Sequence, residues 1–151
     1  MTSVKALSNT YAGVWLEGRG NVVSLSEVVG TGGSTALGPD AGAVGIASTG
    51  PAPKLTGNQV RDTVPSGEAA AFGIAAQGAT SAVVSANLVK NTAPGGATGI
   101  LVTTATRASV TTNTLDTLDY GVVFASSTTG TCKGNTVTAV ATPTLGVTCQ
   151  P

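Results

Sequence analysis

The stretch Leu55-Thr-Gly-Asn58-Gln-Val60 places an asparagine three residues after one apolar side chain and two residues before another. The same arrangement recurs three times towards the C-terminus. The further copies are Val84-Ser-Ala-Asn87-Leu-Val89, Val110-Thr-Thr-Asn113-Thr-Leu115 and Cys132-Lys-Gly-Asn135-Thr-Val137. Repeats with a period of roughly 20 to 50 residues are typical of solenoids, in which each copy forms one structural unit.

A glycine followed by an apolar residue precedes each asparagine at a nearly constant distance. The distance is 13 residues from Gly45 to Asn58, and 14 residues from Gly73 to Asn87, Gly99 to Asn113 and Gly121 to Asn135. A degenerate copy places Ser26 13 residues after Gly13, and we expect the series to close with the pair Gly146-Val147. The distance from each asparagine position to the next glycine varies widely. Each unit therefore has two arms of fixed length and one loop of variable length.

Apolar residues alternate along the stretch that follows each glycine, which predicts a strand with every second side chain pointing inward. Equivalent strands of successive units would stack in parallel about 4.8 Å apart, so that the inward side chains form columns. We expect each asparagine to adopt the left-handed backbone conformation of a tight corner. Its amide can also bond the same amide one coil further along. The sequence therefore predicts an all-β solenoid.

These motifs resemble the right-handed parallel β-helix of the pectate-lyase-like superfamily, from Ala6 to Val147. The resemblance implies a right-handed parallel β-helix of about five to six coils with one variable loop per coil. We expect a single domain over residues 1–151 that belongs to a longer chain or to an assembly. In this family the second turn is short and rich in asparagine, which matches Asn58, Asn87, Asn113 and Asn135. The variable loop corresponds to the third turn, which shapes the ligand groove.

The composition argues against several classes of function. Only 9% of the residues are charged, and seven basic residues balance seven acidic ones. Without a Lys/Arg cluster we expect no nucleic-acid partner, and without a run of 18 apolar residues we expect no insertion into a membrane. The chain contains no histidine, and two cysteines cannot complete a zinc site by themselves. We accordingly expect no metal and no cofactor.

Catalysis in the family that the chain resembles usually needs acidic side chains clustered on the groove side. The seven carboxylates are Glu17, Glu27, Asp40, Asp62, Glu68, Asp116 and Asp119. The spacing puts Asp116 in one outward column with Lys90 and Arg61, and Asp119 lies just before Gly121. These four residues, Asp116, Asp119, Lys90 and Arg61, are the candidates for a catalytic site. A solvated ion pair between Asp116 and Lys90 is the favoured interpretation.

An apolar stripe is expected on the outer face of the strands that follow the glycines. Its members are Trp15, Ala47, Ala75, Leu101, Val123 and Thr148. Three explanations remain open: the variable loops fold over the stripe, a second copy of the chain covers it, or Trp15 stacks on a sugar. Under the last two, Trp15, Leu101 and Val123 would belong to a binding surface.

Both cysteines fall at positions expected to point inward. Cys132 shares a column with Leu55, Val84 and Val110, and Cys149 is expected to share one with Val102 and Phe124. The favoured interpretation is two buried small apolar side chains. The alternative is a disulfide that ties the last strand to the preceding coil, which would fit an oxidising compartment.

These observations favour a non-catalytic structural or adhesion module at the bacterial cell surface or in a virion, similar to a tail spike or fibre and able to contact surface polysaccharide. Its expected partners are further copies of itself, as a trimer or an end-to-end stack, or the rest of a longer chain. The expected location is extracellular. One alternative is a fragment or divergent member of a polysaccharide lyase, hydrolase or epimerase, and a second is a self-assembling filament subunit.

Overall fold

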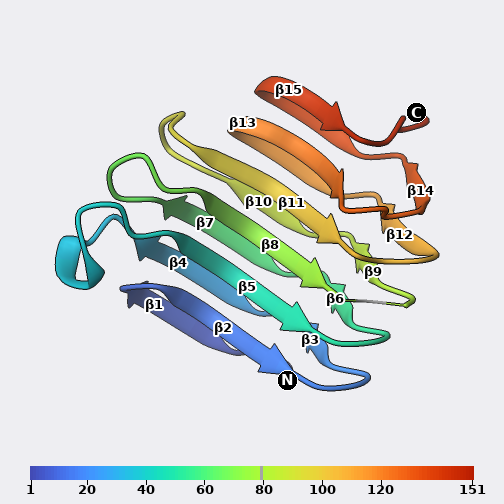
Figure 1. Cartoon of the computed structure of the whole chain (residues 1–151), viewed down its shortest axis with the longest axis horizontal. Helices are drawn as coiled ribbons and strands as arrows, with labels where there is room; N and C mark the ends of the chain where they lie inside the picture. Colours follow the sequence, from blue (N-terminus) through green and yellow to red (C-terminus); the bar gives the residue numbers. More distant parts are fainter. Residues whose placement is uncertain (79) are drawn as a thin grey trace.

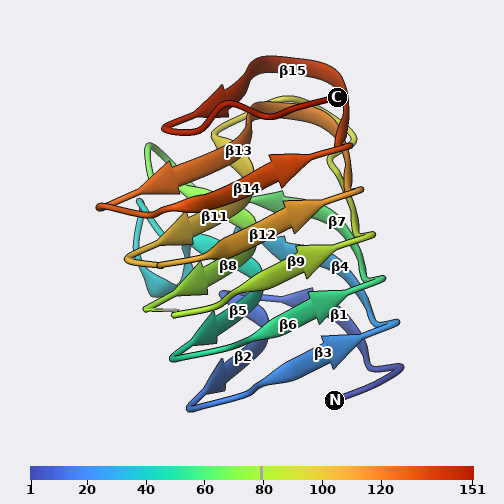
Figure 2. The same ribbon diagram turned by 90° about the vertical axis from the view of Figure 1, so that its right-hand side faces the viewer.

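Short parallel strands stack into a solenoid of about five turns in the computed structural model, which describes residues 1–78 and 80–151. Figure 2 shows the coils following one another from β1 to β15 as a continuous ladder. One wall is a five-stranded parallel sheet. Its strands are β3 (Val22–Ser24), β6 (Lys54–Thr56), β9 (Val83–Ser85), β12 (Ala108–Thr111) and β14 (Gly130–Lys133). The predicted all-β parallel solenoid is therefore confirmed.

The other two walls belong to one ten-stranded sheet that bends around the core (Figure 1). One wall contains β1 (Lys5–Asn9), β4 (Glu27–Gly32), β7 (Gln59–Val64) and β10 (Leu88–Lys90). The opposite wall contains β2 (Ala12–Glu17), β5 (Ala43–Thr49), β8 (Ala71–Gln77) and β11 (Ala97–Thr103). The long strands β13 (Thr114–Ala125) and β15 (Thr136–Leu145) pass through both walls. We name the outer surfaces of these walls the β7 face and the β5 face.

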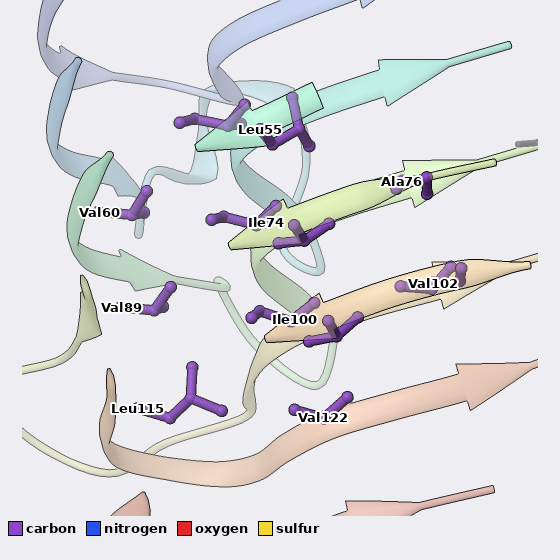
Figure 3. Packing of buried hydrophobic residues seen from close by; sticks show 14 of the residues in the cluster. Leu55, Val60, Ile74, Ala76, Val89, Ile100, Val102, Leu115 and Val122 are labelled. Carbon is purple, nitrogen blue, oxygen red and sulfur yellow. The ribbon is translucent and has the colours of Figure 1, made fainter. Parts of the chain in front are cut away.

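The core consists of columns of apolar side chains in strict register. One column is Val23, Leu55, Val84, Val110 and Cys132, and a second is Val14, Ile46, Ile74, Ile100 and Val122. Ile74, Ile100, Val89 and Leu115 point into the same interior from different walls (Figure 3). These side chains are almost completely buried, and each contributes about 1.5–3 kcal/mol of burial free energy.

The glycine column is required because the coils approach one another closely. A Cβ atom on Gly73 would lie 2.8 Å from the carbonyl oxygen of Gly99, and one on Gly45 would lie 2.6 Å from that of Gly73. Inward side chains of the β7 wall, such as Val89 opposite Gly73, already fill the space that a side chain at the glycine would need. Any larger residue would force neighbouring coils apart, which explains the regular glycines in the repeat.

The tight corner differs from the prediction in one respect. The left-handed residue is the one that precedes the asparagine, as at Gly57 with φ of 65° and Ala86 with φ of 55°. Leu25, Thr112 and Gly134 occupy the same position in the other coils. The asparagine itself is not left-handed, so its role lies in its side chain.

The register of the last coil corrects a second expectation. Thr144 pairs with Val122, and a Cβ atom on Gly121 would collide with the carbonyl of Pro143. Pro143, and not Gly146, therefore continues the glycine column. A proline is tolerated here because β15 is an edge strand, whose outer N–H groups need no partner in the sheet. The outward stripe consequently ends at Leu145, which pairs with Val123, and not at Thr148.

The variable loops project at the junction of the two walls of the large sheet (Figure 1). They join β4 to β5, β7 to β8 and β10 to β11, and the first contains a short 3₁₀ helix over Thr35–Leu37. The first of these loops has ten residues and the other two have six each, and in β13 and β15 the strand crosses the junction without a loop. The variable loop is thus confined to the middle coils.

Candidate functional site

The asparagine side chains form a hydrogen-bonded ladder inside the corner of the solenoid. Nδ2 of Asn58 donates to Oδ1 of Asn87 over 3.0 Å, and Nδ2 of Asn113 donates to Oδ1 of Asn135 over 2.9 Å. Asn87 joins these pairs through Asn113, and Ser26 donates its backbone N–H to Asn58 at the N-terminal end. The ladder is structural, because Asn58, Asn87 and Asn113 are at most 2% exposed.

Cys132 and Cys149 form a disulfide with a Cα–Cα distance of 4.4 Å. The pairing follows from the register of the last coil, in which Lys133 bridges to Gln150, so Cys149 lies directly above Cys132. Cys149 therefore continues the column of Val110 and Cys132, and the column with Val102 and Phe124 expected from sequence is wrong. The cause is the one given above: the glycine position of the last coil is Pro143 and not Gly146, so every residue of this coil was expected three residues too late.

The candidate residues Lys90 and Asp116 lie together on the β7 face. Lys90 Nζ is 2.8 Å from Asp116 Oδ2, and the Thr117 hydroxyl donates to Oδ1 of the same carboxylate. The hydrogen bonds from Lys90 and Thr117 hold the pKa of Asp116 below its ordinary value. Arg61 is in register with Lys90, but its guanidinium donates to Oε1 of Gln59.

The fourth candidate, Asp119, is engaged elsewhere. Its Oδ2 accepts the backbone N–H of Gly96 over 2.7 Å. The hollow beside Arg61 and Lys90, of about 350 Å³, is lined in addition by Asp62, Leu88 and Thr92 and not by either candidate carboxylate. The four residues therefore do not converge on one cleft.

Aspartates also fasten the variable loops to neighbouring coils. Oδ1 of Asp62 accepts both the backbone N–H and the hydroxyl of Thr92 over 2.7 Å, and Oδ1 of Asp40 accepts the N–H of Glu68 over 2.9 Å. The Gly96 bond of Asp119 has the same function. The sequence did not reveal these contacts, since the loop residues Thr92, Glu68 and Gly96 have no fixed spacing in the repeat.

Six of the seven carboxylates are thus engaged. Glu17 accepts the indole N–H of Trp15 over 3.1 Å, and Glu27 lies 3.4 Å from Lys5. Within residues 1–78 and 80–151, the Glu68 carboxylate alone makes no hydrogen bond or ion pair.

The β5 face carries the apolar stripe. Trp15 is 41% exposed and Leu145 is 51% exposed, whereas Ala47 and Ala75 are buried against Val44. Trp15 stacks on Tyr11 with ring centroids 6.0 Å apart. These rings and Phe72 border a hollow of about 100 Å³ whose floor is formed by the two alanines.

Leu101 of the stripe is half-buried and Val123 is 9% exposed. The variable loops contribute Gly42 and Ala70 to the rim of the hollow, and Ala43 at the start of β5 lies beside them. The loops therefore border the N-terminal half of the stripe without closing over it, and the outer ends of the stripe remain accessible.

Neither a cluster of metal ligands nor a membrane-spanning helix occurs in the described part of the chain. No group of three or more Cys, Asp or Glu side chains there is arranged to hold a metal ion. No helix in residues 1–78 and 80–151 has the length and apolar character needed to cross a membrane.

Comparisons with known proteins agree with the architecture. Searches of curated proteins and of solved structures returned no match. A family model described as "Right handed beta helix region" matches residues 1–148, nearly the whole chain. Together with the stacked parallel coils and the asparagine ladder, this match shows that the chain belongs to the right-handed β-helix family.

Proposed function

We propose that this protein is a non-catalytic structural module that acts outside the cell, at the bacterial cell surface or in a virion. The observation that carries the proposal is the engagement of six of its seven carboxylates in bonds within the fold. Asp40, Asp62 and Asp119 fasten loops to adjacent coils. Carboxylates used in this way support a rigid rod.

The alternative of a polysaccharide lyase, hydrolase or epimerase has less support. Glycoside hydrolysis needs two carboxyl groups roughly 5–10 Å apart that face one bond of the substrate. Asp116 is paired with Lys90 on the β7 face, and Asp119 is bonded to a loop backbone. The chain also has no histidine to act as a base near neutral pH.

The disulfide supports the proposed location. Disulfides persist in secreted proteins, on cell surfaces and in virions, and they are rare in a reducing cytosol. Cys132 and Cys149 join the last two coils, where the edge of the solenoid is least supported by neighbouring strands. A covalent bond there protects an exposed part of the rod.

The proposal is tested by separating stability from turnover in carboxylate variants. Asp119→Ala should lower the free energy of unfolding by about 1 kcal/mol, because the Gly96 N–H loses a charged acceptor. Glu68→Ala is the matched control and should have no effect. Neither variant nor the unmodified protein should release reducing ends or unsaturated products from neutral or uronate-containing polysaccharides. Turnover by the unmodified protein that Asp116→Asn or Asp119→Asn abolishes, with the fold intact, would support the enzyme alternative instead.

A further inference from the structure

Three outward columns run along the β5 face, and two of them contain no charged residue. These two columns are Ala12, Val44, Phe72, Thr98, Tyr120 and Thr142, and Trp15, Ala47, Ala75, Leu101, Val123 and Leu145. The third column, at one border of the face, is Glu17, Thr49, Gln77, Thr103 and Ala125, and it contains one charged residue. Among these, Trp15, Tyr120 and Leu145 are large side chains that are at least 41% exposed. A solvated sheet face would carry charged residues in such positions.

The β7 face provides an internal comparison, because its two outward columns come from the same coils. Those columns are Lys5, Glu27, Gln59, Leu88, Thr114 and Thr136, and Leu7, Val29, Arg61, Lys90, Asp116 and Thr138. Five of these twelve residues are charged, whereas Glu17 is the one charged residue among the seventeen in the three outward columns of the β5 face. The two faces of one sheet therefore have different environments, and the β5 face is the one suited to a protein contact.

We propose that the β5 face is a homodimer interface, in which a second copy packs antiparallel about a two-fold axis that runs along the strands. Such an axis places β2 against the partner's β15, β5 against the partner's β13, and β8 against the partner's β11. The interface would be isologous, so that each contact occurs twice.

The side-chain sizes along the stripe are complementary under this operation. Ala75 opposes the partner's Leu101, and Ala47 opposes the partner's Val123, so that a small residue meets a larger one. At the two ends Trp15 opposes the partner's Leu145. In the adjacent column the order is reversed, with Ala12 facing the partner's Thr142 at the ends and Phe72 facing the partner's Thr98 near the centre. At the ends the bulkier pair lies in the stripe, and at the centre it lies in the adjacent column, so the side chains fill the space between the two copies evenly.

The hollow on this face fits a side chain better than a ligand. It measures about 100 Å³ and has an alanine floor, whereas small-molecule sites are usually at least ~300 Å³. The half-buried Leu101 of the partner, which opposes Ala75, would enter it in the antiparallel arrangement. This is a knob-into-hollow contact between protein surfaces.

The area of the face is consistent with a reversible dimer. Strands of seven residues are about 23 Å long, and the six stacked strands of this face span about 24 Å, which gives roughly 550 Å² per partner. Specific interfaces begin near ~600 Å² per partner. We therefore expect a dimer that dissociates in the micromolar range rather than an obligate one.

The first test measures mass against concentration by sedimentation velocity, from about 1 to about 500 μM. The unmodified protein should change from monomer to dimer in this range. Leu145→Lys should weaken the dimer at least about tenfold, because it buries an unpaired charge. Thr138→Lys lies on the same strand but on the β7 face, and it should leave the dissociation constant within about twofold.

The second test examines the direction of packing. Trp15→Glu and Leu145→Lys should each impair self-association, yet a mixture of the two variants should form heterodimers. The mixed dimer keeps one Trp15–Leu145 contact and replaces the other with an ion pair between Glu and Lys. A two-fold axis along the solenoid would place like coils together and predicts no such rescue. Circular dichroism should show that both variants keep the β-sheet spectrum.

Three outcomes would overturn the proposal: a monomer at all concentrations, a trimer or larger mass, or a dimer that is equally weakened by Thr138→Lys. Quenching of Trp15 fluorescence by a soluble polysaccharide in a protein that stays monomeric would assign the face to a saccharide instead. Dimerisation weakened by Leu145→Lys and rescued by the mixture would establish the antiparallel interface. The outcome is independent of whether the protein has catalytic activity.

Discussion

Asn87 donates two hydrogen bonds to a single atom, Oδ1 of Asn113 on the next coil, from its backbone N–H over 3.0 Å and from Nδ2 over 2.9 Å. Nδ2 also donates to the carbonyl of Leu55 over 2.8 Å. Oδ1 of Asn87 in turn accepts both the backbone N–H and the Nδ2 of Asn58. All polar atoms of this side chain are therefore satisfied within the protein, although the residue is only 2% exposed.

Replacing Asn87 by alanine should lower the free energy of unfolding by about 3 kcal/mol or more. The substitution leaves two donors of Asn58 without their acceptor in a buried site, and each such group costs about 1–3 kcal/mol. It also removes the Nδ2 bond to the Leu55 carbonyl. Urea unfolding followed by circular dichroism measures the change. Asn135→Ala is the control, since Asn135 lies half-buried at the end of the ladder and should cost less. Equal losses at both positions would contradict the role assigned to burial.

The disulfide should stabilise the last coil more than the rest of the solenoid. It closes a loop with a sequence separation of 17, for which chain entropy gives a stabilisation of about 3 kcal/mol. Reduction, or the double substitution of Cys132 and Cys149 by serine, should lower the free energy of unfolding by up to that amount. Hydrogen exchange should show the fastest loss of protection at the Gln150 and Gly134 amides, which bond across the last two coils. Uniform loss of protection in all coils would contradict local stabilisation.

Replacing Lys90 by methionine should raise the pKa of Asp116 towards its ordinary value, because the largest cause of the lowered pKa is the hydrogen bond from Lys90. Since the folded-state pKa is the lower one, the stabilisation by the charged carboxylate is present above the unfolded-state pKa. It is lost as the pH falls through the folded-state pKa. Carboxyl carbon shifts measured by NMR during an acid titration report the change directly. Lys5→Met, on the same face but beside Glu27, should leave the Asp116 titration unaltered.

The regular part of the fold could be predicted because it is set by spacing. The columns that contain Leu55, Ile74 and Val60 follow from apolar residues at fixed distances from glycine and asparagine. A shift by one residue would turn every inward side chain outward, so the register is strongly determined. The outward positions of Lys90 and Asp116 followed from the same spacing, and the structure places them in register.

The last coil could not be predicted from glycine alone. Pro143 occupies the position of the glycines because its carbonyl, rather than its side chain, meets Gly121. Because Gly146 lies three residues later and is followed by an apolar residue, the sequence predicts it at this position instead. The expected columns of Leu145 and Cys149 are therefore wrong. The signal that would have corrected it is the spacing itself: Asn135 precedes Pro143 by the same eight residues that separate Asn113 from Gly121.

The repeat pattern also could not predict the loop contacts of Asp40, Asp62 and Asp119. Each depends on where an irregular loop brings one backbone N–H, and no periodicity encodes that position. The floor of the hollow illustrates the same limit. Ala47 and Ala75 were correctly placed outward, but their burial depends on contacts with Val44 and Phe72 in the next column.

The corner before the asparagine predicts opposite effects for two substitutions. Gly57 has φ of 65°, where an L-residue with a Cβ atom is strained by about 1–2 kcal/mol, so Gly57→Ala should destabilise the protein by about 1 kcal/mol. Ala86 occupies the equivalent position with φ of 55°, and Ala86→Gly should be neutral or stabilising by up to about 1 kcal/mol.

The control for this pair is Ala141→Gly, at an exposed position of β15 that is not left-handed. There the added backbone freedom of glycine should destabilise the protein by about 0.5–1 kcal/mol. Thermal and urea unfolding of the three variants give the comparison. An equal destabilisation by Ala86→Gly and Ala141→Gly would mean that Ala86 is not strained. The residue before the asparagine would then not be the left-handed residue of the corner.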